Sequence, residues 1–363
     1  MNDRQLLLVV ALALVAGVAG LVIGLASCTG DDSAAPPTGS TVGTPEGRAP
    51  FLALLLPAET DGTALDEALS EAGIDHSVDT AEDAQVQQAQ DALPRASAIL
   101  VAPVDAFAGA GIVQAAKDAG VPVVQYDRFP SAGPLPDYFT GYDQEAIGRM
   151  EGEGLIRCLG EQGVVDGSVI TVNGPPGDPT ADALDQGFRA VLQTKPFVEL
   201  GRVHAPVWTA EAARPEVGDL LDSGEVDGVL ATSDAYAAGV IAELRARKLD
   251  GVPVTGSGAS VGAIQEILAG NQCMTVYAPV MPEAQAAARF AAGIAQGVVP
   301  DLQDSVLVGD RRVPAVLSQP VEITDDVQLL NDTVIRDGAM TWDEICSRAY
   351  ERFCPPASQR GGG

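Results

Sequence analysis

The sequence predicts an α/β protein with two lobes, each a doubly wound parallel sheet, and a ligand cleft between the lobes. From residue 51 onward, short apolar runs that suit strands covered on both faces alternate with helical patterns. Repeated β-α-β units of this kind give parallel sheets with helices on both faces. The strands are too many for one compact sheet, and a Pro-rich loop at 129–137 divides them. The 363 residues are enough for two domains of ordinary size.

The predicted elements follow in order, and turn residues punctuate them. Gly73, Pro94 and Gly120 end the first three helices, and Asp143 is placed to cap the fourth. The predicted strands are 51–56, 98–103, 121–126, 138–142, 168–172, 199–204, 226–231, 252–255 and 274–277. The predicted helices are 64–72, 85–93, 111–119, 143–159, 210–221, 235–247 and 282–295, with two more ending at 192 and 269.

The division into lobes follows from this order. We expect one lobe from residues 51–128 with 277–301, and the other from residues 129–276 with 302–354. Residues 355–363 are expected to form a disordered tail.

The N-terminus predicts export. Met1 to Gln5 carries one Arg, an apolar run covers 6–26, and Leu25-Ala26-Ser27-Cys28 resembles a bacterial lipobox. We therefore expect a lipoprotein signal peptide at 1–28 with Cys28 lipidated. An uncleaved membrane helix is the alternative. Both predictions place the rest of the chain outside the cytoplasmic membrane and tethered to it, through a flexible linker at 29–48 that is rich in Pro, Gly, Ser and Thr.

Composition and motifs exclude several functions. A formal net charge of −29 argues against nucleic acid and against electrostatic attachment to anionic lipid. The two histidines, His76 and His204, are isolated, so a metal site is not expected. No dinucleotide or P-loop motif follows a strand, and no nucleophile elbow lies near a histidine. The sequence predicts neither an enzyme nor a cofactor.

Four cysteines besides Cys28 permit two disulfides in an exported protein. Cys346 and Cys354 are close in sequence and are expected to pair if the last helix ends between them. Cys158 and Cys273 would then form the second bridge.

Polar residues gather where the predicted strands end, and in an open α/β sheet the ligand binds beyond those ends. The ends are 57–59, 103–105, 127–128, 178–180, Trp208, 233–234, 257–258 and Tyr277. Asp127 and Arg128 offer carboxylate acceptors beside a rigid fork of donors, which suits a neutral molecule covered in hydroxyls. A salt-bridged strand end is the structural alternative.

Three further strand-end residues have structural alternatives as well. The indole of Trp208 could pack on the C–H face of a sugar or only against other side chains. Asp178 and Asp234 could be helix caps instead of ligand contacts.

Four segments resemble the xylose-binding branch of the periplasmic sugar-binding proteins. They are 125–128 (QYDR), 173–188 (NGPPGDPTADALDQGF), 231–239 (ATSDAYAAG) and 270–279 (GNQCMTVYAP), and the similarity runs from about 51 to 354. The resemblance implies a type I periplasmic-binding-protein fold and a role as substrate-binding subunit of an ABC importer. It implies ligand contacts at Asp127, Arg128, Asp178, Thr180, Trp208, Ser233 and Ser257.

The chain departs from the family pattern at several of these positions. The segment after the first strand, 57–62, lacks the family's basic and aromatic residues. Ser233 stands for an Asn, Gly258 for an acidic residue, and Ala278 for a basic or amide residue. Each hydrogen bond lost to a hydroxyl costs about 0.5–1.5 kcal/mol, so the identity of the ligand does not follow from the resemblance.

The sequence thus predicts a membrane-anchored, monomeric protein that captures a small polyhydroxylated solute, such as a pentose or another aldose. Closure of a hinge between the lobes would trap the solute for delivery to an ABC permease. The alternative is the same fold with an altered site, acting as a sensor or an envelope interaction protein.

Overall fold

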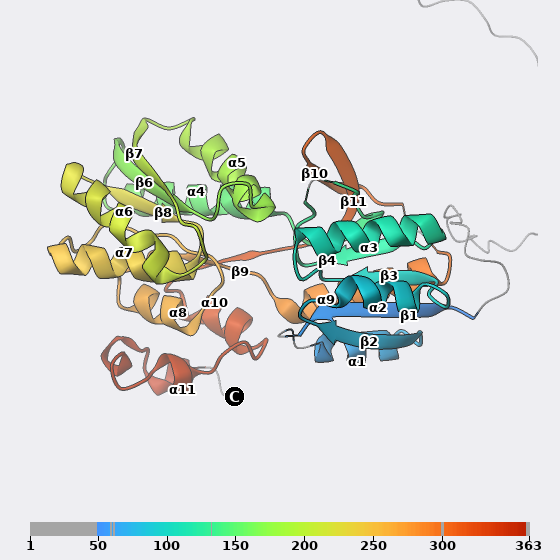
Figure 1. Ribbon diagram of the computed structural model, residues 1–363. Coiled ribbons are helices and arrows are strands. Elements are labelled where there is room, and N and C mark those ends of the chain that lie inside the picture. The colour runs from blue at the N-terminus through green and yellow to red at the C-terminus, as the bar shows by residue number, and fades with distance from the viewer. Residues whose placement is uncertain (1–48, 59, 61, 132, 299–300, 361–363) are drawn as a thin grey trace, which may run out of the picture. The chain divides into compact units, whose positions relative to one another are not determined.

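The computed structural model describes residues 49–360 except 59, 61, 132 and 299–300, and the predicted signal peptide, Cys28 and linker lie outside this range. The described part contains two main sheets with flanking helices (Figure 1). Within it, no helix combines the length and the apolar character needed to cross a membrane.

The first sheet has seven strands in the order β10-β11-β5-β4-β3-β1-β2, and all neighbours are parallel except β10 and β11. The strands are β1 (Phe51–Pro57), β2 (Asp75–Ala81), β3 (Ala98–Val101), β4 (Val123–Tyr126), β5 (Tyr138–Tyr142), β10 (Asp304–Val308) and β11 (Arg311–Ser318). The helices that pack on it are α1 (Thr63–Glu71), α2 (Gln85–Ala92), α3 (Ala106–Ala119) and α9 (Val280–Ala295).

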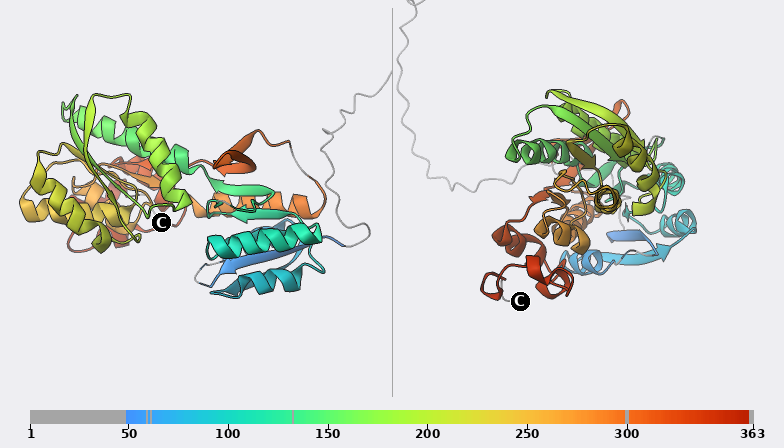
Figure 2. Two further views of the ribbon diagram at one scale, coloured as in Figure 1. Left: turned by 45° about the horizontal axis from the view of Figure 1, so that its top comes forward. Right: turned by 90° about the vertical axis from the view of Figure 1, so that its left-hand side faces the viewer.

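Helices cover both faces of this sheet, as its apolar strands predicted. Leu52, Leu54 and Leu56 pack with alanines of α9, whereas Ala53 and Leu55 pack with residues of α3. Figures 1 and 2 show α1 and α9 on one side of the sheet and α2 and α3 on the other. Because β1 and β3 are buried on both faces, they carry no polar residue along their length.

The second sheet has the order β7-β6-β8. Isolated bridges from Val229 to Val254 and from Ser257 to Val276 extend it to the antiparallel pair of β9 and β12. Its strands are β6 (Gly167–Asn173), β7 (Phe197–His204), β8 (Gly228–Ala231), β9 (Thr275–Tyr277) and β12 (Val321–Ile323). Its helices are α4 (Gln144–Glu161), α5 (Pro179–Leu192), α6 (Ala210–Ser223), α7 (Asp234–Arg247), α8 (Val261–Leu268), α10 (Val327–Leu330) and α11 (Trp342–Ile345), with a π-helical turn at Asn331–Ile335.

The predicted lobe boundaries at 129 and 302 are wrong for three strands. After the loop at 129–137 the chain returns to the first sheet as β5, which pairs with β4. Strands β10 and β11 form a hairpin whose second strand pairs with β5. Gly309-Asp310 between apolar residues is a typical hairpin turn, but the pairing of its second strand with β5 has no local signal, so the predicted place of 302–318 in the other lobe is wrong.

The predicted disordered tail is also wrong as far as residue 360. A short 3-10 helix spans Ala357–Gln359, and the carbonyl of Gln359 accepts a hydrogen bond from Asn331 Nδ2 at 2.8 Å. These contacts hold the segment against the π-helical turn.

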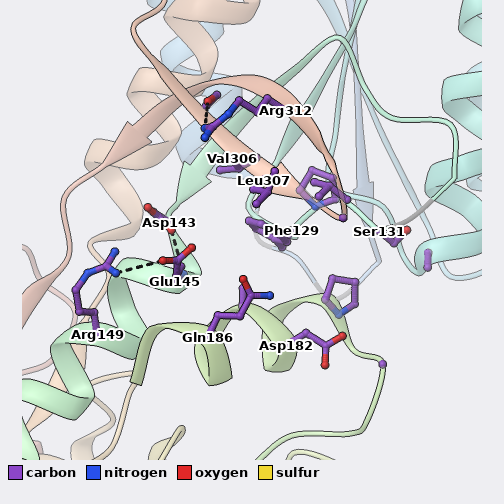
Figure 3. Close-up of a pocket in the computed structure, with 18 residues that line it drawn as sticks. Phe129, Ser131, Asp143, Glu145, Arg149, Asp182, Gln186, Val306, Leu307 and Arg312 are labelled. Atoms are coloured by element: carbon purple, nitrogen blue, oxygen red, sulfur yellow. Dashed lines mark hydrogen bonds and ion pairs between the residues drawn. The ribbon is translucent and has the colours of Figure 1, made fainter. Parts of the chain in front are cut away.

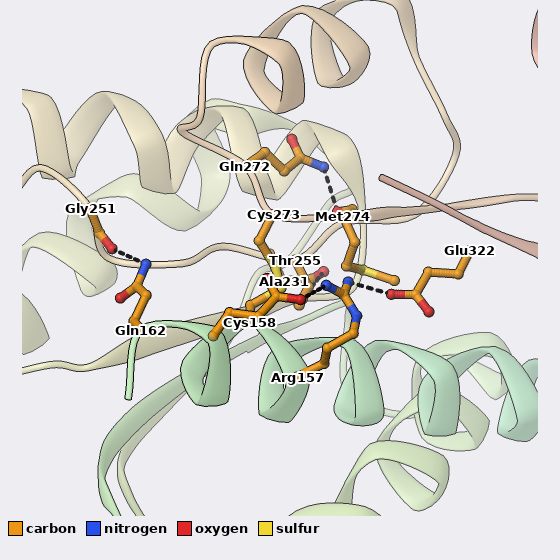
Figure 4. The surroundings of a disulfide bond; sticks show 11 residues. Arg157, Cys158, Gln162, Ala231, Gly251, Thr255, Gln272, Cys273, Met274 and Glu322 are labelled. Atoms are coloured by element: carbon orange, nitrogen blue, oxygen red, sulfur yellow. Dashed lines mark hydrogen bonds and ion pairs between the residues drawn. A yellow bond between two sulfur atoms is a disulfide. The ribbon is translucent and has the colours of Figure 1, made fainter. Parts of the chain in front are cut away.

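Both predicted disulfides are confirmed. Cys158 on α4 bonds to Cys273 just before β9, and Cys346 bonds to Cys354. Figure 4 shows the first bridge beside Arg157, which donates to Glu322 of β12 at 2.6 Å. The bridge therefore fastens α4 to the strand pair at the edge of the second sheet.

Candidate functional site

Asp127 and Arg128 stand at the end of β4 in a conformation that the backbone fixes. Asp127 has φ +60°, an unfavourable left-handed value for a residue with a side chain, and its N–H donates to Thr140 O at 2.9 Å. Arg128 Nη1 donates to Val104 O at 2.7 Å, and Gln125 Nε2 donates to Arg128 O at 2.8 Å. The guanidinium is thus braced against the end of the neighbouring strand β3.

A cavity of about 510 Å³ lies beside this strand end and brings four of the seven predicted contact residues together. Arg128 approaches it from the first sheet, and Asp178, Thr180 and Trp208 approach it from the second. Its other walls include Asp105, Gln125 and Phe129. The volume and the mixture of apolar walls with a few polar groups are typical of small-molecule sites.

Asp178 both caps α5 and lines the cavity, so the two alternatives for this residue coincide. Its Oδ1 accepts hydrogen bonds from the N–H groups of Thr180 at 2.8 Å and Ala181 at 3.0 Å. Pro179 occupies the first helical turn, where its missing N–H costs nothing. The cap holds Thr180 at the cavity wall.

Trp208 also has both predicted roles: it packs against other side chains and it lines the cavity. Its ring stacks on Tyr236 with centroids 5.4 Å apart, and a Cβ added to Gly174 would lie 2.2 Å from the indole. Tyr236 OH donates to Val207 O at 3.1 Å, which holds the loop that carries the tryptophan. The indole is therefore presented to the cavity from a rigid support.

The other three predicted residues do not line this cavity. Asp127 directly precedes Arg128, which does line the cavity. Ser233 caps α7 by accepting from Tyr236 N at 3.2 Å, and Ser257 contributes its carbonyl to Asp234 N at 2.9 Å.

Asp234 is a structural residue in this arrangement. It is buried and accepts from Ser260 N and Thr275 Oγ1, each at 2.7 Å, and from Gln272 Nε2 at 3.2 Å. These bonds tie the start of α7 to the segments around β9.

A second cavity of about 690 Å³ lies between the β10–β11 hairpin and the first turns of α4 and α5 (Figure 3). Four of its five charged lining side chains already have partners within the protein; Asp182 is the fifth. Glu145 pairs with Arg149 at 3.2 Å, Arg312 donates to Ser305 Oγ at 3.1 Å, and Asp143 caps α4. The smaller cavity, which the strand ends line, is the better candidate site.

Sequence reasoning missed two buried carboxyl groups, Glu151 on α4 and Glu283 on α9. Glu151 is 0% exposed and Glu283 is 4% exposed. Both carboxyl oxygens of Glu151 and Oε1 of Glu283 are buried without a hydrogen-bond partner among the described residues. Each stands on the apolar stripe of its helix, which was the available signal. Burial, followed by the charge of Asp127, raises the pKa of Glu283 to about 9. Burial and then Asp234 raise the pKa of Glu151 well above its usual value.

These pKa values predict that stability falls as the pH rises. The folded state keeps a proton on Glu283 that the unfolded chain releases above its ordinary pKa of 4.5, so unfolding is favoured progressively between pH 4.5 and about 9. At pH 7 this costs on the order of 3 kcal/mol. We expect Glu283→Gln to raise the free energy of unfolding at pH 7 and to flatten its pH dependence, as measured by urea titration at several pH values. The exposed substitution Glu211→Gln should leave both unchanged, and an equally steep pH dependence in Glu283→Gln would contradict the assignment.

Comparison with known proteins agrees with this fold. Residues 58–298 match the periplasmic binding protein domain family, which is well over half of the chain. The chain belongs to this family. Its members are non-enzymatic substrate-binding proteins of ABC transporters.

Curated relatives of this family member bind sugars. The D-xylose-binding periplasmic protein of Escherichia coli is 29% identical over 267 residues, which cover 71% of this chain and 78% of the relative. A multiple sugar-binding periplasmic receptor of Rhizobium radiobacter is 24% identical over 66% of this chain and 74% of the relative.

Solved structures show the same type I fold. An ABC transporter solute-binding protein of Clostridium phytofermentans with bound β-D-glucose has a TM-score of 0.68 at 20% identity and covers 81% of this chain and 99% of that one. A periplasmic ribose ABC transporter protein of Conexibacter woesei has a TM-score of 0.66 at 20% identity over 83% of this chain and 99% of that one. The predicted fold class and family are confirmed.

Proposed function

We propose that this periplasmic binding protein captures a small polyhydroxylated solute, of pentose or other aldose type, for an ABC importer. The observation that carries the proposal is the convergence of Arg128, Asp178, Thr180 and Trp208 on one cavity. A guanidinium, a carboxylate and a hydroxyl can form hydrogen bonds with sugar hydroxyls. An indole face can pack on the C–H face of a sugar ring. The sugar-binding relatives support the same solute class.

The capture step that we propose is hinge closure. Arg128 belongs to the first sheet and Asp178, Thr180 and Trp208 to the second, so a solute that contacts both sets favours the arrangement in which the sets are close. Asp127 would join the site in that arrangement, because it directly precedes Arg128 at the strand end.

The location and partners form part of the proposal. The lipobox-like Leu25-Ala26-Ser27-Cys28 supports a lipid anchor on the outer face of the cell membrane, and the family supports an ABC permease as partner. We propose that the chain acts as a monomer. A sensor or envelope interaction protein with the same fold is the second candidate. Ser233 and Ser257 stand at positions where the resemblance implied ligand contacts, but Ser233 caps α7 and Ser257 accepts a backbone hydrogen bond from Asp234.

We expect Arg128→Ala to weaken sugar binding by about 10- to 100-fold, because a charge-assisted hydrogen bond contributes about 1.5–3 kcal/mol. Isothermal titration calorimetry with a sugar that binds the wild-type protein measures the loss. Arg348→Ala, which changes an exposed arginine near the C-terminal disulfide, is the matched control and should bind as the wild type does. Equal affinities of the two variants would remove Arg128 from the site.

A further inference from the structure

The smaller cavity beside Arg128 adjoins the larger cavity at the β10–β11 hairpin. The two cavities, of about 510 Å³ and 690 Å³, share four lining residues: Ala106, Phe129, Ser131 and Pro179. Residues that line both cavities lie at the junction between them, so the two cavities are neighbouring parts of one groove. Each cavity alone has the volume of a small-molecule site. A solute that fills only the smaller cavity leaves the larger one to water.

One face of helix α5 forms the floor of the larger cavity. The residues of α5 that line it are Pro179, Asp182, Ala183 and Gln186, at positions i, i+3, i+4 and i+7, which share one side of a helix. Pro179 belongs to the junction, and Gln186 lies two turns further along, about 10 Å away at a rise of 1.5 Å per residue. The side chains of Asp182 and Gln186 are exposed, and no hydrogen bond or ion pair joins them to other described residues. The floor therefore offers a carboxylate and an amide to a bound group.

Apolar side chains line the opposite wall of the larger cavity. Val306 and Leu307 lie on β10, and Leu307 is 45% exposed although it is a large apolar residue. Phe129 stands at the junction, where its ring packs edge to face on Phe139 with centroids 5.8 Å apart. Figure 3 shows Phe129 and the hairpin residues across the cavity from Gln186. An apolar wall opposite a few polar groups suits a sugar ring, which has C–H faces and a rim of hydroxyls.

The charges of the larger cavity favour an uncharged group. Glu145 and Arg149 already form an ion pair at 3.2 Å, and Arg312 donates to Ser305 Oγ at 3.1 Å. An anionic group such as a phosphate or a uronate would therefore meet the carboxylate of Asp182 without an unpaired cation among the described lining residues. A single exposed carboxylate is screened by solvent and holds a cation only weakly. A neutral sugar unit can donate a hydroxyl hydrogen to the carboxylate and exchange hydrogen bonds with the amide on α5.

We propose that the solute is a neutral disaccharide of aldoses. One sugar unit binds at Arg128 and Trp208, and the second binds on the α5 face at Asp182 and Gln186, opposite Phe129. This inference rests on the proposed function, because it extends the same site to a second unit. A monosaccharide occupies only the smaller cavity.

The test is calorimetric titration of the full chain with disaccharides and with their parent sugars. Xylobiose is compared with D-xylose, and cellobiose, maltose and isomaltose are compared with D-glucose, so that different linkages are sampled. We expect at least one disaccharide to bind about 10- to 100-fold more tightly than its parent sugar, because the second unit adds hydrogen bonds and a ring contact.

Variants on α5 test where the second unit lies. The double variant Asp182→Asn/Gln186→Ala should weaken binding of that disaccharide about tenfold or more and leave the affinity for the parent sugar unchanged. Because only one of the two ligands is affected, loss of folding cannot explain the result. Gln193→Ala is the matched control, since Gln193 is exposed at the C-terminal end of the same helix and should change neither affinity.

The inference is overturned if a parent sugar binds and no disaccharide binds more tightly, and the proposed function then stands without it. It is also overturned if the preference for the disaccharide survives the double variant, because the second unit then lies outside the larger cavity. If neither the disaccharides nor the parent sugars bind, the proposed function fails for these sugars and the inference fails with it.

Discussion

Removal of the Cys158–Cys273 disulfide is expected to lower the free energy of unfolding by about 5 kcal/mol. The bridge joins residues 115 positions apart, and the entropy that a cross-link removes from the unfolded chain grows with the length of the closed loop. It also fastens α4 to the segment that enters β9, next to the Arg157–Glu322 ion pair. A loss of this size is comparable to the whole stability of many domains.

The second disulfide provides an internal control. Cys346 and Cys354 are 8 positions apart, so the same argument predicts a loss of only about 2.5 kcal/mol. Urea unfolding of Cys158→Ala/Cys273→Ala and of Cys346→Ala/Cys354→Ala measures both. An equal or larger loss for the short loop would show that the long bridge acts through local packing and not through the unfolded chain.

Gly187→Ala is expected to destabilise the protein by about 3 kcal/mol, because α4 and α5 pack too closely for a methyl group. A Cβ at Gly187 would lie 2.0 Å from the carbonyl oxygen of Glu145 and 2.7 Å from the N atom of Arg149, both in the backbone of α4. Gly148 meets the backbone of Leu184 in the same way from the other helix. Since backbone atoms cannot rotate away, the helices must separate.

Gly160→Ala on α4 is the matched control for this substitution. No atom lies within 4 Å of its added Cβ, so the change should stabilise the helix by up to about 1 kcal/mol. Thermal unfolding monitored by circular dichroism compares the two variants. A melting temperature of Gly187→Ala equal to that of the wild type would contradict the close helix contact.

Most of the fold could be predicted from sequence because the central strands and the helices carry strong local signals. The run Leu52–Leu56 and the capped helix after Asp143 are examples. Strand β2 escaped prediction because it is a partly exposed edge strand with the polar sequence DHSVDTA. The place of the β10–β11 hairpin escaped prediction for another reason: its return to the first sheet depends on pairing with β5, which no local pattern encodes.

The candidate site was predictable only in part. Arg128, Asp178, Thr180 and Trp208 were found because strand ends converge in this class of sheet. Ser233 and Ser257 were predicted by analogy with the family, and the structure shows them in capping and backbone roles. Glu151 and Glu283 were overlooked because an acid inside a helix is usually solvated, and only their position on the apolar stripe distinguishes them.

The central claim is that the cavity beside Arg128 binds a small polyhydroxylated solute. Isothermal titration calorimetry of the purified protein against pentoses, hexoses, amino sugars, polyols and nucleosides tests it most directly. We expect at least one sugar or amino sugar to bind with one-to-one stoichiometry and a Kd of about 1 μM or tighter. Absence of binding by every compound at millimolar concentration would contradict the account and favour the sensor or interaction protein.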